Sequence, residues 1–85
     1  MQRSLLMNEM NYKGYVIEAI PEQLVVTGRW RVKFCIWRRR GHASTQRQFG
    51  AGNTYPTERE AVAHCFNFGK QIIDGQMEGY SAADL

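Results

Sequence analysis

Residues 29 to 39 alternate between apolar and basic side chains with a period of two, and this pattern constrains the fold more than any other feature. One parity is apolar and consists of Trp30, Val32, Phe34 and Ile36. The other parity is mostly basic and consists of Arg29, Arg31, Lys33, Cys35, Trp37 and Arg39. Successive side chains of a β-strand point to opposite faces of its sheet. The segment therefore predicts a strand with one buried face and one basic face.

Two further strands are predicted on either side of this one. Residues 12 to 20 are rich in apolar and aromatic side chains and predict a strand that ends at Pro21, although their alternation does not settle which parity is buried. The basic strand itself is expected from 29 to 38. A polar third strand is expected over residues 42 to 49, followed by a loop over residues 50 to 56.

A helix is predicted after this loop. Thr57 followed three residues later by Glu60 forms a capping box, which is typical of a helix start. A core-facing stripe follows at helical spacing and consists of Ala61, Cys65, Phe68 and Ile72. Asp74 and Gly75 are expected to end the helix.

These elements predict an α+β domain with the order β-β-β-α and two layers. Short connections favour a three-stranded antiparallel sheet, and the C-terminal helix is expected on one face of it. Residues 1 to 11 are expected to be a flexible leader, residues 12 to 75 the single domain, and residues 76 to 85 a tail. The helix would cover the apolar parity of the basic strand and leave its basic parity open.

The charge of the 85-residue chain is concentrated in one region. Residues 29 to 48 hold seven of the 11 Lys and Arg residues and no acidic residue, whereas the remainder has four basic and all eight acidic residues. Such polarity suits nucleic acid, an acidic partner or anionic lipid. Two cysteines are few for a secreted domain, and no stretch approaches the ~20 apolar residues of a membrane helix. We therefore expect a cytoplasmic protein without a membrane partner.

Two resemblances follow from particular segments. Tyr-Pro-Thr-Glu-Arg-Glu-Ala at 55 to 61 and Gly-Lys-Gln-Ile-Ile-Asp-Gly at 69 to 75, with the strands before them, resemble a group of small uncharacterised bacterial proteins. That resemblance implies a fold but no activity. The Trp- and Arg-rich strands followed by Thr-x-x-Glu-Ala are also similar in outline to AP2-type and integrase arm-binding domains. Those domains place a three-stranded sheet in the DNA major groove.

The basic parity is the main candidate site. The sequence predicts a non-enzymatic protein that binds DNA or RNA through Arg29, Arg31, Lys33, Trp37, Arg39 and Arg47, with Trp37 stacking on a base or packing. No catalytic motif, metal-ligand spacing or cofactor loop stands out, so no catalytic residue, metal or cofactor is expected. The alternative is a protein-interaction module or homodimer that uses the face bearing Cys35 and Trp37, or a tail that docks on that face.

Overall fold

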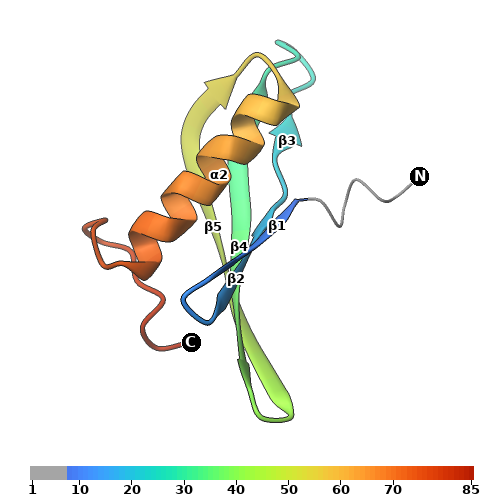
Figure 1. The fold of residues 1–85 in the computed structure, drawn as a ribbon. Helices are drawn as coiled ribbons and strands as arrows, with labels where there is room; N and C mark the ends of the chain where they lie inside the picture. Colours follow the sequence, from blue (N-terminus) through green and yellow to red (C-terminus); the bar gives the residue numbers. More distant parts are fainter. Residues whose placement is uncertain (1–7) are drawn as a thin grey trace.

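The computed structural model describes residues 8–85, which form one sheet with one helix lying across it (Figure 1). The elements follow in the order β1 (Glu9–Tyr12), β2 (Tyr15–Ala19), β3 (Glu22–Gln23), β4 (Trp30–Arg40), β5 (Ala43–Tyr55) and α2 (Glu58–Ile73). Every strand pair is antiparallel. The α+β class, the antiparallel sheet and the C-terminal helix packed against it agree with the sequence, but the expected three strands are too few. The described residues form five.

β4 is the centre of the sheet. β2 pairs with residues 34 to 38 of β4, and the short β3 pairs with Trp30 and Arg31. β5 pairs along the whole length of β4, so it occupies the opposite edge. β1 pairs only with β2 and lies at the other outer edge of the sheet.

The sequence did not predict two of the five strands: the two-residue β3, which lies between the first two expected strands, and β1. Residues 9 to 11 fall in the expected leader, and residues 1 to 7 of that leader lie outside the described part of the chain. A two-residue turn joins β1 to β2, with Lys13 at φ 49° and Gly14 at φ 85°. Positive φ at both central positions is the type I′ geometry that matches the twist of a hairpin. Lys-Gly lacks the usual Asn or Asp at the first position, so the sequence reads as one continuous strand.

β5 is longer than predicted because a bulge carries it through the expected loop. Lys33 pairs with Gly50 while Arg31 pairs with Thr54, so residues 51 to 53 all lie opposite Val32. A bulge accommodates extra residues in one strand without ending the pairing. The strand therefore continues to Tyr55, close to the start of the helix.

α2 begins and ends as the sequence predicts. The Thr57 hydroxyl accepts a hydrogen bond from the Glu60 backbone N–H at 3.2 Å, and Gly75 adopts a φ of 73° just past the helix end. The buried residues of the helix are Ala61, Cys65, Gly69 and Ile72, while Phe68 is only half-buried. Gly69, and not Phe68, is the buried residue at this level of the helix, because the lack of a side chain lets the helix approach Ile17 of β2 closely.

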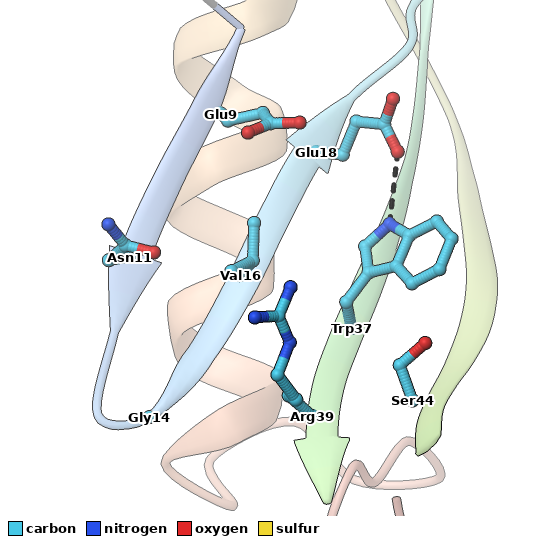
Figure 2. Close-up of a pocket in the computed structure, with 8 residues that line it drawn as sticks. All are labelled: Glu9, Asn11, Gly14, Val16, Glu18, Trp37, Arg39 and Ser44. Carbon is cyan, nitrogen blue, oxygen red and sulfur yellow. Dashed lines mark hydrogen bonds between the residues drawn. The ribbon is translucent and has the colours of Figure 1, made fainter. Parts of the chain in front are cut away.

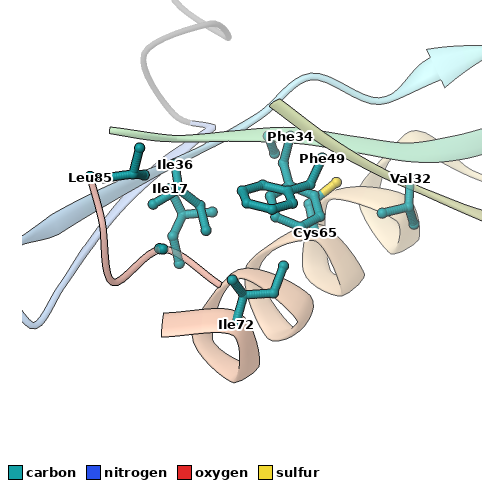
Figure 3. Close-up of a cluster of buried hydrophobic side chains, with 10 residues drawn as sticks. Ile17, Val32, Phe34, Ile36, Phe49, Cys65, Ile72 and Leu85 are labelled. Carbon is teal, nitrogen blue, oxygen red and sulfur yellow. The ribbon is translucent and has the colours of Figure 1, made fainter. Parts of the chain in front are cut away.

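The core lies between α2 and the sheet (Figure 3). Its fully buried side chains from the sheet are Ile17, Val32, Phe34 and Ile36. The rings of Phe34 and Phe49 stack with their centroids 5.5 Å apart. Ala82 and Leu85 of the tail are also buried in this cluster. The tail therefore packs on the helix side of the sheet and not on the face of Cys35 and Trp37.

Candidate nucleic-acid interface

The face of the sheet that α2 does not cover is called the open face. On β4 it bears Arg31, Lys33, Cys35, Trp37 and Arg39, which alternate with the core residues of the same strand. Cross-strand pairing adds neighbours to this face. Val16 of β2 and Gln46 of β5 lie beside Trp37, and Glu18 and Gln48 lie beside Cys35. The predicted separation of an apolar and a basic face along β4 is present in the structure.

Three basic side chains form a row along β4, and Arg31, Lys33 and Arg39 are called the basic row. Same-face neighbours on a strand are roughly 6.6 Å apart, so the row extends over about 26 Å. Within residues 8–85, neither Lys33 nor Arg39 takes part in an ion pair. Arg31 bonds to Glu22 of β3, and both of these side chains remain accessible to solvent. Two of the three cations are therefore available to an anionic ligand without losing a partner.

Arg29 lies just before the basic row and is held against β5. Its Nε donates to the Thr54 hydroxyl at 2.8 Å, and its guanidinium also donates to the Thr54 carbonyl at 3.0 Å. These two bonds fix the guanidinium at one end of the open face, while the side chain stays exposed. Arg29 thus extends the positive charge of the row in a defined position.

Trp37 lies on the open face of β4 beside Val16 of β2, and Arg39 of the basic row lies next to it (Figure 2). Its Nε1 donates to a Glu18 carboxylate oxygen at 3.0 Å, and its indole ring is half-buried. A shallow hollow of about 620 Å³ opens beside the ring, lined by Glu9, Asn11, Gly14, Val16, Glu18, Trp37, Arg39 and Ser44. The hydrogen bond to Glu18 holds the indole in one orientation, so the ring offers a fixed surface to a ligand.

Cys35 shares the open face but contributes little contact surface. Its exposed fraction is only 6%. Burial raises the pKa of its thiol above the usual value, and the nearby Glu18 carboxylate acts in the same direction while Lys33 opposes both. Since the thiol stays protonated at neutral pH, Cys35 acts as a small packing residue beneath its neighbours.

Arg47 does not belong to this interface. It pairs in register with Ile36, so its side chain projects from the helix side of the sheet. There its guanidinium makes two hydrogen bonds to the Asp84 carboxylate, at 2.9 and 2.8 Å, and a third to the Ser81 carbonyl. The prediction that Arg47 joins the other basic residues is therefore wrong. Phe49 has the same parity and is buried in the core, and that signal could have placed Arg47 correctly.

The sequence also missed the acidic part of the open face. Glu9 and Glu18 lie directly opposite each other on β1 and β2, and Glu18 contacts Trp37. The basic side chains of the face come from β4, and Arg39 lines the same hollow as the two carboxylates. The sequence did not predict the turn at Lys13 and Gly14. Without that turn, neither the pairing register of Glu9 nor the face on which it lies can be assigned.

A second hollow adjoins the basic row at the bulge of β5. It has a volume of about 580 Å³ and is lined by Arg31, Val32, Lys33, Gln48, Phe49, Gly50, Ala51 and Gly52. The two glycines carry no side chain that would fill the space, and the charged groups lining the hollow are both cationic. This part of the surface favours an anionic group.

Comparison of the chain with known protein families, with curated proteins and with solved structures finds no match. The two resemblances noted in the sequence therefore remain expectations, and the geometry of the open face has to carry the functional argument. In the described part of the chain, no helix is long and apolar enough to cross a membrane.

Proposed function

We propose that this chain binds single-stranded nucleic acid across the β4 and β5 half of its open face. One observation carries the proposal: an oriented Trp37 ring lies between Lys33 and Arg39, which have no ion-pair partner in residues 8–85, on the same uncovered face. Proteins that bind single strands combine a positively charged track for the backbone with aromatic rings on which bases stack. This face has both parts.

The two parts act on different portions of the ligand. Lys33 and Arg39 neutralise phosphates on either side of Trp37, and Arg31 and Arg29 continue the track toward the bulge of β5. An unpaired base stacks on the indole, a contact worth about 1–3 kcal/mol per base. A base within a duplex is already stacked on its neighbours and cannot cover the indole, so the ring favours a single strand.

Glu9 and Glu18 set the direction of the track. Their carboxylates repel phosphates from the β1 and β2 half of the face, so the backbone follows β4. Glu18 also keeps the indole in place through the bond to Nε1. The acidic pair thus serves to position the ligand.

The alternative of a protein interface centred on Cys35 and Trp37 has less support. Cys35 is almost completely buried and offers a partner little surface. Charged residues lie at either end of this small apolar area, whereas the centre of a protein interface is usually depleted of charge.

A fluorescence titration tests the proposal. In a Trp30→Phe background Trp37 is the reporter, because the sequence has two tryptophans. We expect a short single-stranded oligonucleotide to quench its emission, with log affinity falling against log salt at a slope of about −3 for roughly four phosphate contacts. Binding that does not depend on salt would contradict the proposal.

Matched variants distinguish the contribution of the basic row to affinity from the effect of the net charge of the protein. Lys33→Ala and Arg39→Ala should each weaken binding and reduce the magnitude of the salt slope by about 0.7. Arg59→Ala is the control, because Arg59 is an exposed cation on α2, away from the open face. An equal loss of affinity in all three variants would show that net charge alone is responsible.

A further inference from the structure

The outer edge of β5 is an unpaired strand edge, and the pairing of β4 determines which backbone groups of β5 point outward. The Ile20 N–H donates to the Lys33 carbonyl at 2.8 Å, so the backbone of Lys33 faces β2. Backbone groups alternate in direction along an antiparallel strand. The even residues of β4 therefore bond to the odd residues of β5, such as Phe34 to Phe49. The N–H and C=O groups of Ser44, Gln46 and Gln48 consequently point away from the sheet.

In the described part of the chain, no strand pairs with this edge, and the tail bonds to this stretch through the Arg47 side chain on the helix side of the sheet. Residues 43 to 48 are all exposed, and no backbone hydrogen bond from outside the β4–β5 ladder reaches them within residues 8–85. α2 packs mainly on β2 and β4, and the β4–β5 hairpin extends beyond the other strands (Figure 1). A neighbouring strand can therefore approach this edge without meeting the helix.

The edge also lacks the features that usually prevent pairing. β5 contains no proline, and Arg47 is its one charged residue. Natural edge strands are normally protected by prolines, several charges or bulges. The bulge opposite Val32 protects only the far end of β5. The regularly paired stretch from Ala43 to Phe49 remains open on its outer side.

We infer that this stretch pairs with the same stretch of a second copy of the chain, antiparallel and across a two-fold axis at Gln46. Gln46 is the midpoint between the hairpin turn and the bulge, so this register uses the whole regularly paired stretch. Ser44 then faces Gln48 of the second copy, and three hydrogen-bonded residue pairs provide about six backbone bonds. Arg47 faces Thr45 of the second copy. An axis at Arg47 would instead oppose two arginines, which is unfavourable. The two sheets become one continuous sheet.

Sedimentation measurements on the full chain, from about 10 µM to about 1 mM, test the inference. We expect a reversible monomer–dimer equilibrium. Gln46→Pro removes the outward N–H and should raise the dimer dissociation constant about tenfold or more, whereas Gln46→Ala keeps that N–H and should not. A wild-type chain that stays monomeric over the whole range would overturn the inference.

A charge exchange tests the register without altering the backbone. Gln46→Lys and Gln46→Glu each place like charges opposite each other at the two-fold axis, so each variant alone should dimerise more weakly, by up to about fivefold. An equimolar mixture should recover association, because the two introduced charges attract. Failure of the mixture to exceed either variant alone would overturn the Gln46 register. These results do not depend on nucleic-acid binding.

Discussion

Gly69 is the residue that brings α2 close to the sheet. A Cβ at this position would lie 2.8 Å from both Cδ1 and Cγ2 of Ile17, which is fully buried. Gly69→Ala gains about 1 kcal/mol of helix propensity but overpacks the core at a cost of about 1–3 kcal/mol. We expect a net loss of about 1 kcal/mol in unfolding free energy, measured by urea denaturation.

Two controls separate packing from helix propensity. Ala63→Gly changes an exposed position of the same helix and should cost about 1 kcal/mol through propensity alone. In an Ile17→Val background, Gly69→Ala should cost less than in the wild type, because part of the clashing side chain is gone. Stabilisation by Gly69→Ala in the wild-type background would contradict the close helix approach.

Asp74 links the β1–β2 turn to the end of α2. Its carboxylate accepts hydrogen bonds from Lys13 Nζ and from the Tyr12 hydroxyl, each at 2.7 Å, and Lys13 followed by Tyr12 holds its pKa below the usual 3.8. A depressed pKa contributes stability above the unfolded value, and that contribution is lost as pH falls through the folded value.

Asp74→Asn should therefore flatten the acid dependence of unfolding free energy below about pH 4. Urea denaturation at several pH values from about 5 to about 2 would measure the slope. The Asp84 carboxylate has a pKa lowered by Arg47, so part of the slope should remain until Asp84 is also changed. An unchanged slope in Asp74→Asn would exclude this linkage.

At the scale of single residues, the sequence predicted most of the basic residues of the open face, because alternation assigns a face to each residue of a strand. It placed Arg31, Lys33, Trp37 and Arg39 together on this basis. The face of Arg47 was predicted wrongly because its neighbours in the polar strand are mostly uncharged and exposed, so their alternation gives only a weak signal. Its bidentate bond to Asp84 depends on a tail 37 residues away, which no local pattern can predict.

At the scale of elements, the tail is part of the core. Leu85 and Ala82 have exposed fractions of 3% and 1%, and the Tyr15 hydroxyl donates to the Ala82 carbonyl at 3.2 Å. Leu85→Ala should lower the unfolding free energy by about 2 kcal/mol, at the low end for a buried leucine. Chemical denaturation would measure the loss. Ala83→Ser, at an exposed tail position, should change stability by no more than about 0.5 kcal/mol.

The sequence did not predict β1 or the end of β5, because the turn before β2 and the bulge in β5 lack the residues that usually mark such features. The helix was predicted almost to its ends because the capping box, the apolar stripe and Gly75 all agree. β1 was missed because Lys13–Gly14 is an unusual type I′ turn. The end of β5 was missed because Gly50, Gly52 and Pro56 resemble a loop, whereas pairing with β4 keeps residues 50 to 55 extended.

At the scale of the whole molecule, the protein is a flat slab whose Cα atoms extend over 41 × 34 × 16 Å. Helix and tail cover one broad side, and the other is the open face. Although the formal net charge is only +3, the open face carries a row of cations on β4 with carboxylates on the strands beside it. Such an arrangement should bind polyanions locally and weakly, with a strong dependence on salt.

The most direct test of this account is an amide-shift titration of labelled protein with single-stranded oligonucleotides at about 50 and about 200 mM salt, a range that strongly weakens phosphate contacts. The account predicts shifts on the open face of β4 and β5, centred on Lys33, Trp37 and Arg39, that shrink at the higher salt. Shifts confined to α2, or no shifts at the lower salt, would contradict it.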